Sequence, residues 1–487
     1  MTATIPELPL LSLSPDEQDL VTALRTDLMQ HRFRLELLDS YFNGEQLVRD
    51  LGISIPPQLK GLHTVIGWPR IGVEALEQRL ELEAFRWADG SDAEDLREVA
   101  EANDLFDEAS LAHLDALTYG REYIAVGSGD CGTDDCPPLI TAESPLDMTL
   151  FWDARARVAT AALRESRDCE AFGLAPDDRL VTLYLPDQTI HAVQADGGGW
   201  EVLDRDMHRL GVVPVIRMAN RQRTADRVGK SEITPEVMSI TDAACRRLMG
   251  MEVASEFYGA PQRYILGASE SAFQDAEGNT KSAWETYIGR VLALERDEDG
   301  QVPTVGQFTA HDPQTYTKII DLYARIMATQ LGLPPHYLGY TTDNPASADA
   351  IRSSEAQLVK RAERRCRRFG GAWSDVMRLA LWVRDGQPPE RSRRIECVWR
   401  DPATPTVAQQ TDAAVKLVQA GILPPDGEVV LEMAGLSEDQ RQRVAAERRR
   451  AQGRQILDRL SQLGTEDEAD QEPDAEAEEP DGGDDGL

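Results

Sequence analysis

Two short glycine-bearing motifs are the residues of this sequence whose types and spacing could bind a nucleotide. Gly229-Lys230-Ser231 matches the end of a P-loop, in which backbone amides and a lysine hold phosphate oxygens. A P-loop also needs a glycine five residues before Gly229, and this position is Thr224. The segment before it is polar rather than an apolar strand. We therefore predict a solvated loop that leads into a helix, with nucleotide binding as the less favoured alternative.

The second motif extends from Gly127 to Gly132. It has the spacing Gly-x-Gly-x-x-Gly and follows a strand-like run. A dinucleotide-binding turn of this kind must open directly into a helix, whose N terminus receives the pyrophosphate. Here Pro137 and Pro138 follow, and proline lacks the amide that a helix interior needs. The sequence therefore predicts a hairpin turn between two strands. A nucleotide-binding enzyme that uses either motif is kept only as the alternative function.

Other patterns of catalysis or metal binding are missing from the sequence. The seven histidines are scattered, with no His-Glu-x-x-His, and no Gly-x-Ser-x-Gly elbow occurs. We expect no catalytic residue, no metal site and no cofactor. The six cysteines form no Cys-x-x-Cys pair, which favours free thiols in a reducing cytoplasm. A metal or disulfide role for Cys131 and Cys136 is the less favoured alternative.

The net charge of the chain limits the kinds of molecule that it can bind tightly. Lys and Arg number 51 and Asp and Glu number 85, which gives a net charge of −34. A chain this acidic is a poor candidate for tight nonspecific DNA wrapping, because phosphate binding needs clustered cations. No apolar run of about 18 residues occurs, so no membrane span is expected. The N terminus has neither the basic start nor the apolar stretch of a secretory signal.

Basic clusters nevertheless occur on this acidic background. Their spread around the helices favours salt bridges to acidic surfaces of neighbouring subunits over phosphate contact with DNA, and both interpretations stay open. The clusters comprise Lys360, Arg361, Arg364, Arg365, Arg367 and Arg368; Arg391, Arg393 and Arg394; and Arg441, Arg443, Arg448, Arg449, Arg450 and Arg454.

The first half of the chain divides into a helical part and a β-rich part. Ser14-Pro15 supplies a cap and a first-turn proline, so a helix should begin there and run to about residue 41. Two further helices are expected near residues 60–87 and 93–119. Residues 121–218 hold β-branched and aromatic runs separated by turn residues, which predict a mostly antiparallel sheet.

Long helices dominate the second half. Apolar residues three or four apart predict helices over 234–259, 312–331 and 345–384, with a β-containing insertion at 261–311 and a bend at Gly370-Gly371. A helical unit with helices at 406–420, 427–434 and 437–463 is expected after them. Residues 464–487 contain twelve acids and no Lys or Arg, so we expect a disordered tail. The apolar stripes of the long helices need partners, and subunit neighbours in an oligomer would supply them.

Several segments resemble the portal proteins of tailed bacteriophages, in the branch with many actinobacterial-virus members. The strongest is LGLPPHYLGYTTDNPASADAIRSSEAQLVKRAERRCRRFGGAW, residues 331–373, with its Leu-Gly-x-Pro…Leu-Gly element and its Asn-Pro-x-Ser-Ala-x-Ala-Ile. Residues 229–267 and 398–424 also resemble the family, as do YFNGEQLV and LKGLHTVIGWPRIGVEAL near the N terminus. The matches keep their order and spacing over most of the chain.

The resemblance implies an α+β, mainly α, portal fold assembled as a ring around a central channel. It divides the chain into a wing at 1–230 (helical 15–120, β-rich 121–218), a first stem helix at 231–260, a clip at 261–311, a second stem helix at 312–331, a tunnel loop region at 332–344, a long wing helix and return at 345–400, a helical crown at 401–463 and the acidic tail at 464–487.

The resemblance also implies the function and the partners. Portal proteins form rings, usually of twelve subunits, at one capsid vertex of the virion, after synthesis in the bacterial host cytoplasm. They nucleate procapsid assembly with the major capsid and scaffolding proteins, and they pass double-stranded DNA during terminase-driven packaging and ejection. They then dock a head–tail adaptor protein, and the terminase large subunit supplies the ATPase. The DNA-facing tunnel loop would be Tyr340, Thr341, Thr342, Asp343 and Asn344.

Overall fold

The computed structural model describes residues 12–47, 64–129, 136–166, 179–194, 199–258, 263–266, 304–307, 314–339, 348–390, 393–403 and 405–469. The chain divides into two compact units, Met1–Ala403 and Thr404–Leu487.

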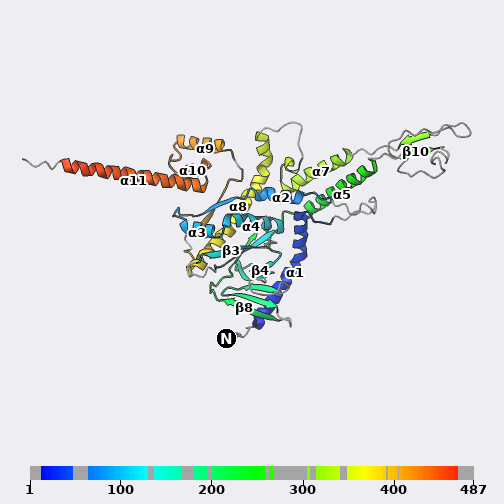
Figure 1. Cartoon of the computed structure of the whole chain (residues 1–487), viewed down its shortest axis with the longest axis horizontal. Coiled ribbons are helices and arrows are strands. Elements are labelled where there is room, and N and C mark those ends of the chain that lie inside the picture. Colours follow the sequence, from blue (N-terminus) through cyan, green and yellow to red (C-terminus); the bar gives the residue numbers. More distant parts are fainter. Residues whose placement is uncertain are drawn as a thin grey trace, which may run out of the picture. The chain divides into compact units, whose positions relative to one another are not determined.

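Helix α1 (Pro15–Asn43) opens the first unit and joins two cores (Figure 1). Ser14 caps it: its hydroxyl accepts from the Glu17 amide, and the Glu17 carboxylate accepts from the Ser14 amide at 2.9 Å. The helix ends at Gly44, whose φ of 76° is left-handed. Val21 and Leu24 pack against a β-sheet, whereas later residues of α1 enter the main helical core. The predicted start at Pro15 is confirmed.

The β-rich part forms two antiparallel sheets, as the sequence predicts. One sheet has the strand order β4-β5-β6-β7-β8, and the other has the order β3-β2-β9. A small apolar cluster that includes Tyr123, Met148 and Ala162 joins the two sheets. The strands are β2 (Arg121–Ser128), β3 (Pro138–Glu143), β4 (Met148–Asp153), β5 (Val158–Ser166), β6 (Leu180–Tyr184), β7 (Thr189–Gln194), β8 (Trp200–Asp206) and β9 (Val215–Ala219).

Two of the expected N-terminal helices are wrong in their extent. The segment 60–87 contains helix α2 (Trp68–Glu77) and then strand β1 (Leu82–Trp87), which pairs antiparallel with β12 (Ile395–Trp399). The segment 93–119 contains two helices, α3 (Glu94–Ala102) and α4 (Leu105–Tyr119). They are separated at Asp104, whose φ of 45° cannot continue a right-handed helix.

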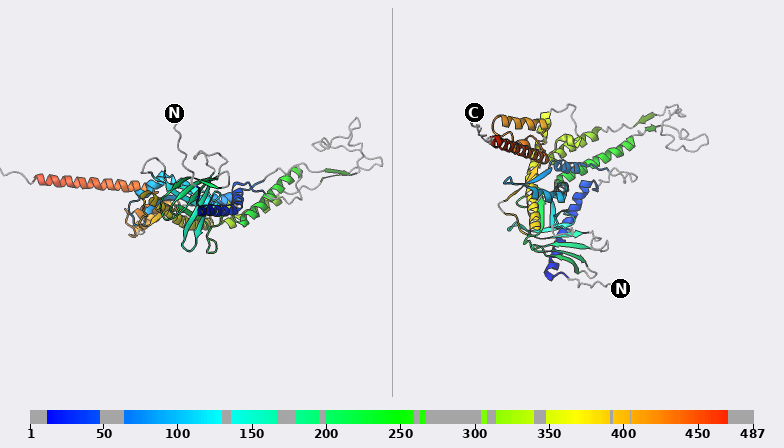
Figure 2. Two further views of the ribbon diagram at one scale, coloured as in Figure 1. Left: turned by 90° about the horizontal axis from the view of Figure 1, so that it is seen from below. Right: turned by 60° about the vertical axis from the view of Figure 1, so that its left-hand side comes forward.

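Helices α5 (Pro235–Tyr258) and α7 (Gln314–Leu331) pack side by side and form an arm (Figure 2). Strand β10 (Arg263–Leu266) follows α5 in the sequence, and strand β11 (Thr304–Gln307) precedes α7. The two strands pair antiparallel. The structure therefore confirms the two helices and shows a pair of strands in the insertion between them. The rest of the insertion, residues 261–262, 267–303 and 308–311, lies outside the described residues.

Helix α8 (Ala348–Asp385) runs through the main core of the first unit and passes without interruption through Gly370-Gly371. Its apolar stripe, which includes Leu358, Phe369 and Trp373, is buried against α4, β2 and neighbouring elements of the same chain. The expectation that every long helix needs a subunit neighbour is therefore wrong for α8, because the folded unit covers this stripe.

The second unit contains three helices in its described part: α9 (Val407–Gln419), α10 (Glu428–Met433) and α11 (Glu438–Ala469). Helix α10 packs against both others, and Ser437 and Gln440 form the predicted capping box of α11. Because α11 extends to Ala469, residues 464–469 are helical, and the prediction of disorder is wrong for these six residues. The remaining tail lies outside the described residues.

The cysteines differ in part from the expectation of free thiols. Cys245, Cys366 and Cys397 are free. Cys136 is disulfide-bonded, so the free-thiol prediction is wrong for this residue. Among the described helices, none is both long and apolar enough to cross a membrane.

Candidate functional site

The predicted tunnel-loop residues Tyr340, Thr341, Thr342, Asp343 and Asn344 lie outside the described residues. The elements on either side of them are described, namely the short helix η4 (Pro335–Leu338) and the start of α8. These two elements are tied together at the base of the connection.

That tie consists of three polar side chains. The Tyr337 hydroxyl lies 3.3 Å from a Glu355 oxygen and accepts a hydrogen bond from Arg79 at 3.1 Å. Arg79 also pairs with Glu355 at 3.3 Å, and the side chains of both ions are more than four-fifths buried. The described elements on either side of residues 340–347 are therefore held together by contacts among Tyr337, Glu355 and Arg79.

The described parts of the two glycine motifs do not have the form of a nucleotide site. Strand β2 includes Gly127, and the next described element after the second motif is β3, which pairs antiparallel with β2 and is not a phosphate-binding helix. This confirms the predicted hairpin, of which residues 130–135 lie outside the described part.

Gly229-Lys230-Ser231 is fixed by its own backbone hydrogen bonds. The Lys230 amide donates to the Asn220 carbonyl at 2.9 Å, and the Glu232 amide, two residues further on, donates to the Leu117 carbonyl at 2.9 Å. The following amide donates to the Ser231 hydroxyl at 2.8 Å. These N–H groups are not free to hold a phosphate, so the nucleotide alternative is wrong for this segment.

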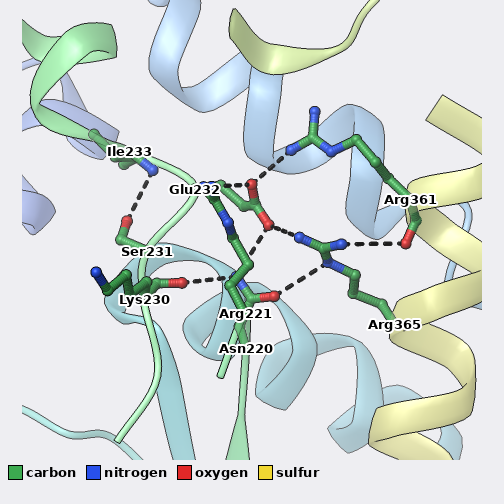
Figure 3. A network of polar contacts seen from close by, with 8 residues as sticks. All are labelled: Asn220, Arg221, Lys230, Ser231, Glu232, Ile233, Arg361 and Arg365. Atoms are coloured by element: carbon green, nitrogen blue, oxygen red, sulfur yellow. Dashed lines mark hydrogen bonds and ion pairs between the residues drawn. The ribbon is translucent and has the colours of Figure 1, made fainter. Parts of the chain in front are cut away.

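Glu232, directly after this motif, is the centre of a buried charge network that sequence reasoning missed (Figure 3). Its side chain is 1% exposed and pairs with Arg361 at 2.6 Å, with Arg365, and with Arg221 at 3.6 Å. Asn220 completes the network: its amide nitrogen donates to Glu232 at 3.0 Å and its oxygen accepts from Arg365 at 3.1 Å.

The network keeps Glu232 ionised. Burial alone raises the pKa of a carboxyl group, but the guanidinium groups of Arg365 and Arg361 outweigh this effect, so the pKa of Glu232 lies below its ordinary value. Burial lowers the pKa of Arg361, and Glu232 opposes this shift. The site is thus a structural anchor between α8 and the loop that precedes α5.

A cleft with a volume of about 650 Å³ opens beside this network and is strongly basic. None of the described residues that line it is acidic. We call it the Arg cleft; its cationic lining includes Arg221, Arg223, Lys230, Arg364, Arg367 and Arg368.

The basic cluster on α8 is therefore used in two ways. Arg361 and Arg365 satisfy Glu232 inside the same chain, which corrects the expectation that they pair with a neighbouring subunit. Arg364, Arg367 and Arg368 are exposed and make no ion pair in the part of the chain that the structure describes.

The arm carries an uncovered apolar face. On α7, Leu322 is 53% exposed and Ile326 is 38% exposed, and they lie one helical turn apart. Ala324, Met327 and Ala328 on the other side are buried in the unit's core. Helix α7 therefore has one apolar face that is buried in the core and one that the described part of the chain leaves exposed.

Comparison with known proteins identifies the family. Residues 24–454 match the model of the family described as phage portal protein, SPP1 Gp6-like. The chain belongs to this phage portal protein family. As a member it is a structural protein of the virion and not an enzyme. The resemblance found in the sequence is confirmed, and the mixed, mainly helical fold agrees with the fold class that it implied.

The chain is similar over most of its length to curated portal proteins. It is 39% identical over 388 residues to the portal protein of Mycobacterium phage D29, which covers 78% of each chain. The portal protein of Mycobacterium phage L5 is 38% identical over the same length and share of each chain. Among solved structures, a chain from the neck of the native GTA particle, computed with C12 symmetry, matches with a TM-score of 0.43 and 15% identity. That match covers 79% of this chain and 95% of the other.

Proposed function

We propose that copies of this chain assemble into a ring, of twelve subunits, that forms the DNA channel at one capsid vertex. The ring nucleates procapsid assembly with the major capsid and scaffolding proteins, and it passes double-stranded DNA during packaging by the terminase large subunit and during ejection. It then docks a head–tail adaptor protein. The family membership supports this role.

The observation that carries the ring proposal is the uncovered face of α7. Leu322 and Ile326 lie on a helix already packed against α5, so the arm keeps apolar surface for a further partner. Burying apolar surface stabilises an interface by about 25 cal/mol per Å². Contacts between two different surfaces of identical subunits close into a ring when the rotation closes.

In this proposal α5 and α7 are the stem helices, and the β10–β11 pair is the base of the clip, where terminase and adaptor proteins bind. Helix α8 crosses the wing, and α9, α10 and α11 form the crown. The net charge of −34 supports a channel through which DNA slides, because repulsion keeps phosphates from binding tightly.

The ring proposal can be tested by measuring the size and shape of the particles that the purified protein forms. Negative-stain microscopy should show rings for the unmodified chain, and Leu322→Glu or Ile326→Glu should yield smaller species. The matched control is Thr317→Glu, an exposed residue about 180° around α7 from Ile326, which should keep the rings. A stable monomer at every salt concentration would refute the proposal.

The tunnel loop is the second part of the proposal. Tyr340, Thr341, Thr342, Asp343 and Asn344 would face the DNA, because their polar groups can contact a phosphate backbone without strong cationic capture. The tie between Tyr337 and Glu355 supports a loop that projects from one fixed point. Replacing residues 340–343 by Gly and Ser should spare the rings and impair DNA packaging or retention; full packaging by this variant would reject the assignment.

A further inference from the structure

The Arg cleft holds positive charge that the described part of its own chain does not neutralise. Arg364, Arg367 and Arg368 lie at i, i+3 and i+4 on α8, so their guanidinium groups share one side of the helix. The Arg368 side chain keeps contact with solvent, but the protein encloses part of it, and this partial burial lowers its pKa. A partly buried cation is costly without a counter-charge, so the cleft is suited to an anionic partner.

A complementary surface lies elsewhere on the same unit. Residues 92–107, which cover α3 and the first turn of α4, contain seven acids and one base, Arg97. Arg97 pairs with Glu94 at 3.2 Å and with Glu101 at 3.6 Å. Four exposed acids of the segment make no ion pair within the described residues: Asp92, Glu98, Asp104 and Asp107. We call residues 92–107 the acidic segment.

The two surfaces lie too far apart to neutralise each other within one subunit. Helix α3 packs near the end of α8, where the pKa of Arg384 is raised by its hydrogen bond to Asp385 and also by Asp95 and Glu98. Sixteen residues separate Arg384 from Arg368, which corresponds to about 24 Å along a helix. A direct ion pair requires a separation of about 4 Å.

We propose that the Arg cleft of each subunit binds the acidic segment of the neighbouring copy of this chain. This inference rests on the proposed ring. A ring interface joins two different surfaces of identical subunits, and here one surface is basic and the other acidic. Contact of cleft with cleft, or of acidic segment with acidic segment, would bring like charges together and is disfavoured. The interface therefore fixes the direction in which subunits join.

Charge reversal with rescue tests the pairing. Arg364→Glu/Arg367→Glu and Asp92→Arg/Asp107→Arg each place like charges at the interface, and the fourfold variant restores opposite charges with the polarity exchanged. Rings are counted by negative-stain microscopy and native mass spectrometry, and thermal unfolding verifies that each variant folds. A milder pair, Arg364→Ala/Arg367→Ala, removes the charge without adding repulsion. The control, Arg449→Glu/Arg450→Glu, makes the same charge change on exposed residues of α11.

Each double reversal should lower the fraction of chains in rings about tenfold, and the fourfold variant should recover most of it. The loss should be larger at about 0.1 M salt than at about 1 M salt, because screening weakens exposed charge pairs.

Unchanged rings in both reversals, or no recovery in the fourfold variant, would overturn the inference while leaving the ring intact. If the Arg364→Glu/Arg367→Glu variant still forms rings but no longer retains DNA, the Arg cleft binds DNA and not the acidic segment. If the unmodified chain forms no ring, the proposed function itself fails, and the inference fails with it.

Discussion

The Glu232 carboxylate accepts a hydrogen bond from Arg365, which lies 133 residues further along the chain. One residue precedes α5 and the other lies in the middle of α8, so the pair fixes the base of the arm to the core helix. Arg361, one turn earlier on α8, binds the other carboxylate oxygen at 2.6 Å.

Glu232→Ala should destabilise the protein by about 3–5 kcal/mol, because it leaves neighbouring guanidinium groups buried without their counter-charge. Urea unfolding would measure the loss. The control is Glu363→Ala, which removes the partner of exposed Lys360 and should cost no more than about 1 kcal/mol. An equal effect of the two substitutions would show that the buried network contributes no special stability.

A half-buried carboxyl group on α4 should make stability fall as pH rises. Burial, together with the nearby Asp39 carboxylate, raises the pKa of Asp115 to about 6, whereas its ordinary value is 3.8. The folded state therefore binds more protons than the unfolded state between these values, so stability decreases as pH rises through this window. The full penalty applies above about pH 6.

Asp115→Asn should remove this penalty and raise stability by roughly 1–3 kcal/mol at about pH 7.5, with a smaller gain at about pH 4.5. Thermal unfolding at both pH values tests the sign. Asp107→Asn, an exposed acid on the same helix, should give no comparable difference between the two conditions. A gain for Asp115→Asn that is larger at the acidic pH would contradict the assignment.

The sequence predicted those features that depend on neighbouring residues, such as helix caps and the effect of proline. Ser14 and Pro15 predicted the start of α1, and Pro137-Pro138 excluded a helix after the second glycine motif. The strand β1 was missed because its partner, β12, is more than 300 residues away, and no local window contains that pairing.

The same limit explains the missed site. Glu232 directly follows the Gly-Lys-Ser motif, but its partners Arg361 and Arg365 are 129 and 133 residues away in the sequence. No local pattern links these residues. The clustering of arginines on α8 was visible in the sequence. Which of them point toward a buried carboxylate, and which toward the cleft, depends on the helix rotation that the folded core sets.

Two glycines should respond oppositely to the same substitution. Gly229 has φ of 117°, and an added Cβ would lie 2.0 Å from the Gly120 carbonyl oxygen. Gly229→Ala should therefore cost more than about 1 kcal/mol, since neither backbone segment can move freely. Gly371 lies inside α8 with no atom within 4 Å of an added Cβ, so Gly371→Ala should stabilise by about 0.5–1 kcal/mol. Thermal unfolding of both variants should show shifts of opposite sign.

A buried histidine couples α4 to α8. His113 Nε2 accepts a hydrogen bond from Trp373 Nε1 at 2.8 Å, and its ring stacks on Phe369 at 5.3 Å between centroids. Burial lowers the pKa of His113 to about 3, so the ring is neutral at physiological pH and its proton lies on Nδ1.

Trp373→Phe should cost roughly 1–3 kcal/mol beyond the lost packing, because it leaves the His113 Nε2 acceptor unpaired in the core. In the double variant His113→Phe/Trp373→Phe neither polar group remains, so the total loss should be smaller than the sum of the single losses. Urea unfolding of the four proteins completes the cycle. Strictly additive losses would mean that the hydrogen bond between α4 and α8 does not contribute to stability.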